Sequence, residues 1–302
     1  MDGNNYIKGC CGKHSSISAT ITMKAVNVCL LLVAIAQAHA ADWAQVQPVY
    51  RDRPTFRVAS HSKIIGGNIA TPGQFPYQVG LFIDGSGFCG GSLISDTVIL
   101  TAAHCVDGIR IFEAHLGAHD IYDMNEPNRV IVISTDGVAH ENFNPATIDN
   151  DIAIVRLGFP VGGFGISPVR LPAFSLVNET FSGDRVRVSG WGRTSDATSG
   201  VSPELKYVDV SVIDNSQCQA YYGNIINESK ICVDTNGGTE GTCHGDSGGP
   251  LVIQESDGEY TEIGIVSFGS VDGCESGFPA AFTRVTEYLE WLEINAGVAL
   301  RP

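Results

Sequence analysis

The chain has 302 residues, of which 17% are charged and 43% are hydrophobic, a composition typical of a globular protein. This length usually corresponds to one to three domains, and the 35 glycines indicate many turns. The formal net charge of −15 argues against a nucleic-acid-binding protein, because such a protein carries a basic surface patch.

The amino-terminal part of the chain contains a predicted export signal. The segment MKAVNVCLLLVAIAQAHA begins at Met23 and has a basic start at Lys24, an apolar stretch and a small-residue ending. This order predicts a signal peptide over 23–40 that is cleaved after Ala40. The apolar stretch is too short to span a bilayer, and a buried core helix is the alternative interpretation. We therefore expect a secreted, extracellular protein with no membrane partner.

Two segments flank this signal. We interpret residues 1–22 as an upstream extension from a misassigned start, with no function. Residues 41–63 are polar, with two prolines and three arginines, and are typical of a pro-segment or linker. The remaining part, 64–302, has eleven basic and thirty acidic residues, and its net charge of −19 repels anionic membranes and nucleic acids.

Short β-prone runs separated by turn residues follow in two sets. The first set lies between residue 64 and about residue 180, at 78–83, 91–94, 97–102, 129–134 and 151–157. The second set lies at 185–192, 206–213, 250–254, 263–269 and 280–285. Many short strands are typical of sandwiches or barrels, and two sets predict two barrels packed side by side. Near the end, apolar residues at helical spacing predict an amphipathic helix over 285–295.

The nine cysteines fall into two groups. Three of them, Cys10, Cys11 and Cys29, lie in the part that we expect to be removed. An even number of cysteines remains, which predicts three disulfides in an exported chain. A zinc site needs closely paired ligands, and none of the remaining cysteines forms a C-x-x-C pair. These six are Cys89, Cys105, Cys218, Cys232, Cys243 and Cys274.

The stretch TCHGDSGGPLV surrounds Ser247 with an acid and three glycines, an arrangement suited to a serine that attacks a substrate. A serine hydroxyl is a poor nucleophile until a base takes its proton, and the usual base is a histidine held by a carboxylate. His104 in LTAAHCV stands at the end of a β-prone run among small residues. Asp151 stands directly before the apolar run IAIV, which favours burial with a partner, whereas Asp149 suits a turn.

Three segments, TAAHC, DIAIV and GDSGGP, resemble in sequence and in order the signature segments of the chymotrypsin-fold serine proteases, the trypsin-like superfamily. IIGG after Lys63 resembles the activation site of that family, and SGWG (189–192) and SFG (267–269) match two further segments. FCGGSLIS and GCESGFP are similar to the arthropod chymotrypsin and collagenolytic branch. The resemblance covers 64–302 and implies an all-β fold of two packed six-stranded antiparallel β-barrels with a C-terminal α-helix, divided near 175–185.

The resemblance assigns a role to each residue of the candidate site. His104 acts as general base and then as acid, Asp151 orients the imidazole, and Ser247 is the nucleophile. The backbone N–H groups of Gly245 and Ser247 form the oxyanion hole, and a side chain at Gly245 would obstruct the substrate. Glycines at 248 and 249 keep the chain close-packed behind the serine.

The resemblance also implies that the chain is made as a zymogen. A trypsin-like protease would cleave between Lys63 and Ile64, and the new α-amino group would pair with Asp246. This pairing orders the oxyanion hole and the specificity pocket.

The expected specificity pocket is open, deep and apolar. The resemblance places the uncharged Gly241 at its floor, so a cationic P1 side chain would be left unpaired. The resemblance places Thr242, Ser267, Gly269 and Ala280 around it, and Ala280 stands where crab-type collagenolytic members have an aspartate. We therefore expect Phe, Tyr, Leu or Met at P1, with an elastase-like or a broad collagenolytic specificity as the alternatives.

By the same resemblance, the disulfides join Cys89 to Cys105, Cys218 to Cys232 and Cys243 to Cys274. Sequons at Asn178 and Asn227 are potential glycosylation sites, and the alternative is that both are unmodified surface turns. The loop near 117–129 has Ala118 and Asn128 where calcium-binding members have ligands, so we expect no metal and no cofactor.

The expected partners are polypeptide substrates, an activating protease and protein protease inhibitors, and we expect a monomer. The two alternatives are a non-catalytic homologue, which belongs to another class, and a regulatory protease. A non-catalytic homologue acting as a binding module would usually lack a triad residue. A clip-type regulatory protease would need a disulfide-knotted amino-terminal module, and residues 41–63 contain no cysteine.

Overall fold

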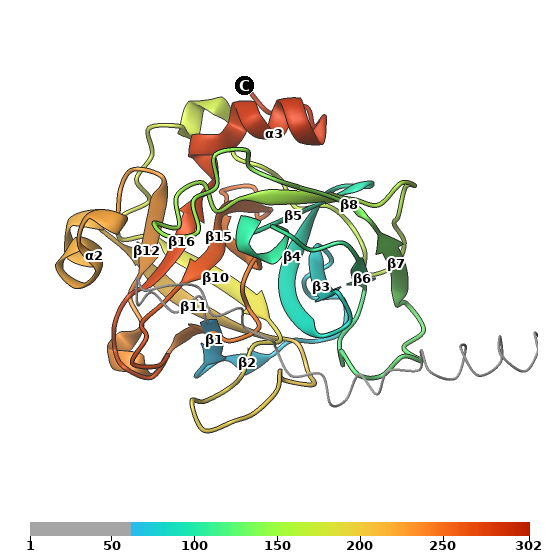
Figure 1. Cartoon of the computed structure of the whole chain (residues 1–302), viewed down its shortest axis with the longest axis horizontal. Helices are drawn as coiled ribbons and strands as arrows, with labels where there is room; N and C mark the ends of the chain where they lie inside the picture. Colours follow the sequence, from blue (N-terminus) through green and yellow to red (C-terminus); the bar gives the residue numbers. More distant parts are fainter. Residues whose placement is uncertain (1–61) are drawn as a thin grey trace, which may run out of the picture. The chain divides into compact units, whose positions relative to one another are not determined.

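The computed structural model of the protein describes residues 62–302, with side chains from Ile65 onward. The predicted upstream extension, the signal peptide and most of the pro-segment lie outside the described residues. Figure 1 shows two curved sheets side by side, with the C-terminal helix α3 against one end of them.

The first sheet has the strand order β7-β6-β3-β4-β5-β9-β8, and all of its pairs are antiparallel. Its two edge strands are consecutive along the chain, with only Thr135 between them. Because this one bent segment pairs with β6 at one edge and β9 at the other, the sheet curls round six strand positions. The strands are β3 (Gln78–Ile83), β4 (Gly87–Ser95), β5 (Val98–Thr101), β6 (Phe112–Leu116), β7 (Val130–Ser134), β8 (Asp136–Ala139) and β9 (Ala153–Arg156).

The second sheet has the order β10-β14-β15-β16-β12-β11-β2, and an additional pairing of β10 with β11 closes six of these strands into a barrel. Strand β2 extends the edge of β11. The strands are β2 (Asn68–Ile69), β10 (Arg185–Gly190), β11 (Lys206–Ile213), β12 (Lys230–Val233), β14 (Pro250–Gln254), β15 (Tyr260–Phe268) and β16 (Ala280–Arg284). A separate pair joins β1 (Ser62–Ile65) to β13 (Gly241–Cys243).

Each barrel has its own apolar core. Leu81, Leu93 and Ile99 are fully buried in the first, and Val188, Ile231 and Phe282 are fully buried in the second. Burial of such side chains stabilises the fold by about 1.5–3 kcal/mol each. The predicted fold of two barrels with a C-terminal helix is confirmed.

The segment predicted as an amphipathic helix over 285–295 is α-helical only in its second part. Residues Val285–Tyr288 form the 3₁₀ turn η6, and the α-helix α3 covers Leu289–Ala296. Leu289 and Leu292 are buried, as the spacing predicts, and Gly297 ends the helix in the left-handed conformation, with φ 66°.

Several elements were not predicted from the sequence. Strands β6 and β12 escape the pattern because charged residues stand among their apolar ones, as in FEAHL and KICV. Helix α2 (Asn215–Tyr222) is polar, and the disulfide at Cys218 anchors it. Shorter 3₁₀ turns are η2 (Ala103–Cys105), η3 (Phe174–Leu176), η4 (Gly223–Ile225) and η5 (Asn236–Gly238).

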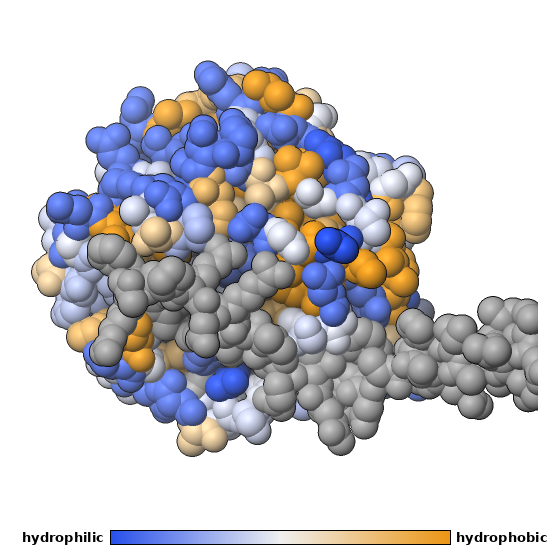
Figure 2. Space-filling view, in the orientation of Figure 1, coloured by the Kyte–Doolittle hydropathy of each residue, from blue (hydrophilic) through white to orange (hydrophobic). Residues whose placement is uncertain are grey.

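The surface in Figure 2 is largely hydrophilic, with hydrophobic atoms gathered on the side where Figure 1 draws β7. Ile131 and Ile133 of β7 are 39% and 67% exposed. Among the described residues, no helix is both long enough and apolar enough to cross a membrane.

Candidate active site

His104 and Asp151 meet in the first barrel. His104 lies in η2 after β5, and Asp151 directly precedes β9, which pairs with β5. The Nδ1 of His104 is 2.9 Å from Oδ2 of Asp151, and the backbone N–H of His104 donates to Oδ1 at 2.9 Å. One bond from the ring and one from the backbone of His104 to the same carboxylate fix the orientation of the ring, so Nε2 is the nitrogen left to exchange a proton. Within residues 62–302, this buried Nε2 has no hydrogen-bond partner.

The Asp151 carboxylate is completely buried. Burial alone would raise the pKa of Asp151, but the His104 ring and the hydrogen bonds from His104 and Ser267 hold it below its usual value. The Ser267 hydroxyl donates to Oδ2 of Asp151 at 2.6 Å, and the Thr283 hydroxyl donates to the Asp151 carbonyl at 2.8 Å. The family resemblance predicts Ser267 in the specificity pocket. Neither contact can be predicted from the sequence, because both join segments more than 100 residues apart.

Ser247 lies in the turn between β13 and β14 of the second barrel and is 6% exposed. Its carbonyl accepts the N–H of Gly90 from β4 at 2.7 Å, so a backbone bond ties this turn to the first barrel. The N–H of Gly248 donates to the backbone carbonyl of Val266 at 2.8 Å, and the N–H of Gly249 donates to the backbone carbonyl of Asp246 at 2.8 Å. The serine is therefore held between the barrels by its backbone.

The glycines around Ser247 have distinct steric reasons. Gly248 has φ +81°, and a Cβ there would contact the Thr101 hydroxyl and the Gly90 carbonyl. Gly245 has φ +102°, and its Cβ would lie 2.6 Å from Val201. The neighbour of Gly245 is thus the 193–202 loop, a contact that the sequence did not indicate. In the part of the chain that the structure describes, the N–H groups of Gly245 and Ser247 donate no hydrogen bond.

Asp246 is a second buried carboxylate, directly before Ser247 in the chain. It is 0% exposed and accepts the N–H groups of Gly192 at 2.8 Å and Cys243 at 3.0 Å. Burial raises the pKa of Asp246 to about 8, against the lowering effect of the Gly192 bond. A carboxylate in this setting would be stabilised by a buried cationic group.

The residues predicted to line the specificity pocket lie in or directly after β13, β15 and β16. Gly241, Thr242 and Ala280 are buried, whereas Gly269 is partly exposed. Gly241 has φ +144°, and a Cβ there would meet the Thr235 methyl group at 3.3 Å. The Thr235 hydroxyl, a contact not predicted from the sequence, donates to the Phe278 carbonyl at 3.0 Å and so joins the segment before β13 to the segment before β16.

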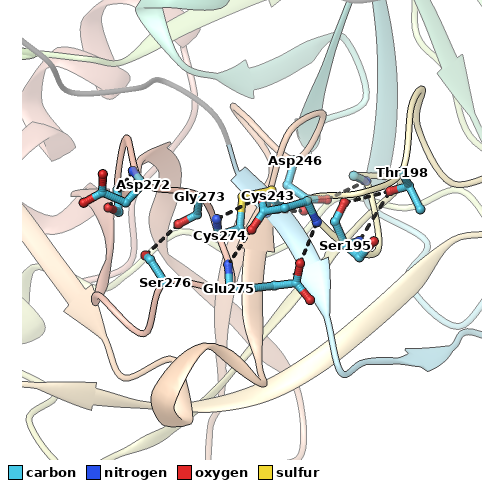
Figure 3. Close-up of a disulfide and its surroundings, with 12 residues drawn as sticks. Ser195, Thr198, Cys243, Asp246, Asp272, Gly273, Cys274, Glu275 and Ser276 are labelled. Carbon is cyan, nitrogen blue, oxygen red and sulfur yellow. Dashed lines mark hydrogen bonds between the residues drawn. A yellow bond between two sulfur atoms is a disulfide. The ribbon is translucent and has the colours of Figure 1, made fainter.

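Figure 3 shows how the loop at 272–276 is held beside Cys243. The disulfide to Cys274 joins this loop to β13, and the Asp196 carboxylate accepts the N–H groups of Cys274 and Glu275 at 3.2 and 3.1 Å. Glu275 in turn accepts the N–H of Asp196 at 2.7 Å. The loop that contains Asp196 and the loop at 272–276 are therefore held together, although they are distant in sequence.

All six expected cysteines form disulfides, in the pairs Cys89–Cys105, Cys218–Cys232 and Cys243–Cys274. Two of these bonds lie beside histidines, but disulfide sulfurs are not available as thiolate ligands. Asn178 and Asn227 are both exposed. The amide of Asn227 donates to Asp149 at 2.9 Å, and attachment of a glycan there would compete with this bond.

The 117–129 loop contains an internal cation. The Arg129 guanidinium donates to the carbonyls of Asp123 at 2.7 Å and Ile121 at 2.8 Å, and its side chain is 1% exposed. Glu126 accepts the N–H groups of His119 and Asp120. A calcium ion would compete with the guanidinium for the same carbonyl oxygens, so this donor set does not suit calcium.

Comparisons with known proteins agree with this arrangement. The trypsin family model matches residues 64–292. Brachyurin of Leptuca pugilator is 46% identical over 78% of this chain and 99% of its own length, and a collagenase of Hypoderma lineatum is 41% identical over 78% and 88%. A solved structure of HL collagenase, 40% identical, superposes with a TM-score of 0.70 over 78% of this chain and all of its own. The chain belongs to the trypsin family, and it is a serine endopeptidase that acts on polypeptide substrates.

Proposed function

We propose that the protein is a secreted endopeptidase, made as a zymogen, that cleaves after large apolar P1 residues with His104, Asp151 and Ser247 as its catalytic triad. One observation carries the assignment. The hydrogen-bond chain from Ser267 through Asp151 to His104 leaves a single free imidazole nitrogen, and Sγ of the adjacent Cys105 lies 3.6 Å from the Ser247 carbonyl oxygen. A non-catalytic binding module is not supported, because the chain belongs with proteases.

The mechanism follows from these groups. His104 Nε2 takes the Ser247 proton as the hydroxyl oxygen attacks the scissile carbonyl, and it then gives that proton to the leaving amine. Asp151 stabilises the imidazolium formed between these steps. The free N–H groups of Gly245 and Ser247 would receive the charge that develops on the carbonyl oxygen. Water repeats the sequence on the acyl-enzyme, with the neutral imidazole again acting as the base.

The triad is tested by non-additivity. Ser247→Ala should remove almost all turnover, and adding His104→Ala should cost little more, because the groups act as a unit. The comparison is made on kcat/KM for one peptide substrate with protein whose folding is checked by circular dichroism. Losses that simply multiply would contradict the assignment.

Activation by cleavage after Lys63 is supported by three features. A basic residue precedes IIGG, the family match begins at residue 64, and the buried Asp246 lies in a site that favours a cationic partner. Trypsin treatment should produce a chain that begins at Ile64 and is active, and Asp246→Asn should be cleaved equally but remain nearly inactive. Full activity in a chain that still contains the Lys63–Ile64 bond would refute this part of the proposal.

The apolar P1 preference rests on the uncharged residues around Gly241. Burial of a large apolar side chain contributes about 1.5–3 kcal/mol, which corresponds to roughly a ten- to hundredfold preference over a small one. Matched substrates with P1 Phe, Leu, Ala and Arg provide the measurement. Arg equal to Phe would exclude the chymotrypsin-like specificity, and Ala above Phe would favour the elastase-like one.

A broad collagenolytic specificity is the second candidate, because a similar sequence and a similar solved structure both carry the name collagenase. Digestion of native triple-helical collagen, compared with its heat-denatured form, separates the two. Cleavage of both forms would favour the collagenolytic alternative, whereas cleavage of the denatured form alone would favour the narrower proposal.

A further inference from the structure

The region behind Asp151 contains a buried lysine that the mechanism above does not use. Lys230 opens β12, is 0% exposed, and is one of only two lysines in 64–302. A buried ammonium costs several kcal/mol of desolvation unless other groups compensate it. Its position therefore requires a physical reason.

The ammonium group binds the turn that leads into Asp151. Nζ of Lys230 donates to the carbonyl of Ile148 at 2.8 Å and lies 3.3 Å from the hydroxyl of Ser229. Ile148 has φ +58° and Asn150 has φ +55°, and a β-branched residue such as Ile148 is unfavourable in this conformation. The bond from Lys230 thus stabilises a strained turn. Because Asp151 follows this turn directly, the turn determines the position of the Asp151 backbone.

The charge of Lys230 also acts on the carboxylates of this turn. Burial lowers the pKa of Lys230, while Asp151 and Asp149 raise it, so the ammonium lies within the electrostatic reach of the catalytic carboxylate. The hydrogen bond to Ile148 holds this ammonium in the same turn as Asp151, whose carboxylate binds the His104 ring. A cation behind Asp151 opposes protonation of the imidazole, because the same negative charge then stabilises two positive ones.

The charged and titratable groups around Lys230 come from several elements. The Arg284 guanidinium donates to the Lys230 carbonyl at 3.2 Å, and Glu287 stabilises the charge of Arg284. Burial raises the pKa of Tyr288 to about 12, so this residue stays neutral at physiological pH. The groups that face this region are thus Asp149 and Asp151 from the turn, Arg284 from β16, and Tyr288 from η6.

We propose that Lys230 is a positioning residue of the protease, whose buried ammonium holds the Ile148–Asp151 turn and sets the charge balance behind the Asp151–His104 pair. The inference rests on the triad proposed above. It assigns to Lys230 two separable effects, one through its hydrogen bond to Ile148 and one through its charge.

Two substitutions separate these effects. Lys230→Gln keeps a donor for the Ile148 carbonyl but removes the charge, and Lys230→Met removes both. The acidic limb of the kcat/KM profile should move to higher pH in both variants by roughly half a unit to one unit, a three- to tenfold loss on that limb, with little change near pH 9. Lys230→Met should lose turnover at all pH values in addition.

The other lysine provides the control. Lys206→Gln, in β11, changes the net charge equally and should leave the profile unchanged. A parent-like profile in both Lys230 variants would overturn the inference. Loss of activity in Ser247→Ala together with such a profile would refute only the role of Lys230, whereas activity in Ser247→Ala would refute the triad itself.

A measurement on the unsubstituted site covers the case in which the Lys230 variants do not fold. In the Lys206→Gln protein, cleaved after Lys63, Lys230 is the only lysine of 64–302, so its side-chain ¹⁵N resonance is unambiguous. An ammonium resonance at pH 6–8 supports the charge effect. A neutral amine over that range would overturn it.

Discussion

At the scale of single residues, glycines decide whether the buried Asp246 can adopt its position. A Cβ on Gly192 would contact both carboxylate oxygens of Asp246, and a Cβ on Gly190 would contact one of them. The N–H of Gly192 also donates to this carboxylate. The backbone at Gly190 and Gly192 therefore packs directly against the Asp246 carboxylate, which would have to shift to accommodate an added methyl group.

Gly192→Ala tests this close contact. We expect a roughly hundredfold loss of kcat/KM in the cleaved enzyme, since a displaced Asp246 moves the adjacent Ser247 by a fraction of an ångström or more. The assay uses cleaved protein and active-site titration, so that only competent molecules are counted. Gly162→Ala is the matched control, because nothing lies within 4 Å of its added Cβ. Equal activity of the two variants would contradict the expectation.

At the scale of elements, β15 contributes an unusual polar contact between the two barrels. Glu262 is 0% exposed, its Oε2 accepts the Ser92 hydroxyl of β4 at 2.5 Å, and burial raises its pKa to about 8. Its other oxygen has no partner within the described part of the chain. The Glu262 carboxyl group is therefore tolerated in the fold when it is protonated and destabilises the fold when it is ionised.

Glu262→Gln should change how stability depends on pH. The pKa of this carboxyl group is near 4.3 in the unfolded chain and about 8 in the folded protein. The folded protein therefore loses stability as the pH rises from the first value towards the second. The variant should therefore match the parent near pH 5 and exceed it at pH 8, and each kcal/mol gained raises Tm by about 2–4 °C.

Thermal unfolding from pH 5 to pH 9 provides the measurement for this substitution. Glu259→Gln, an exposed position directly before β15, is the control and should show no such trend. A difference in Tm between Glu262→Gln and the parent that stays constant over this range would show that the carboxyl group does not titrate as expected.

At the scale of the whole molecule, the C-terminal tail is fastened to both parts of the chain. The Arg301 guanidinium binds the Glu255 carboxylate with contacts of 2.6 and 3.1 Å and the Leu171 carbonyl at 3.1 Å. The Arg301 carbonyl accepts the N–H of Phe174 from the segment that connects the barrels. One side chain therefore links the tail, the connecting segment and the end of β14.

Arg301→Gln should weaken this attachment without changing catalysis. Arg301 chiefly lowers the pKa of Glu255 to about 2, so the pair stabilises the fold above about pH 4.5 and loses this effect as pH falls towards 2. The groups are partly exposed, so we expect a loss of only about 1 kcal/mol at pH 7. Urea unfolding at pH 7 and pH 2.5 measures it, and an equal loss at both pH values would exclude the ion pair as the cause.

The sequence by itself determined the fold class, the family and the local surroundings of Ser247. Strand-length apolar runs predicted both barrels, and GDSGGP, TAAHC and DIAIV stand in short segments whose order is visible in one dimension. Local backbone conformation is also visible in the sequence, because a positive φ such as that of Gly248 favours glycine. These features could be predicted because each depends on residues close together in the chain.

Only the tertiary structure decided which buried polar groups face one another. Ser267 and Asp151 are 116 residues apart, Lys230 and Ile148 are 82 apart, and Ser92 and Glu262 are 170 apart. A lysine or glutamate in a strand is ordinarily expected at the surface, so the sequence gives no sign that either is buried. Their partners follow from how two barrels pack and curl, because desolvated charges are tolerated only where that packing brings a compensating group within reach.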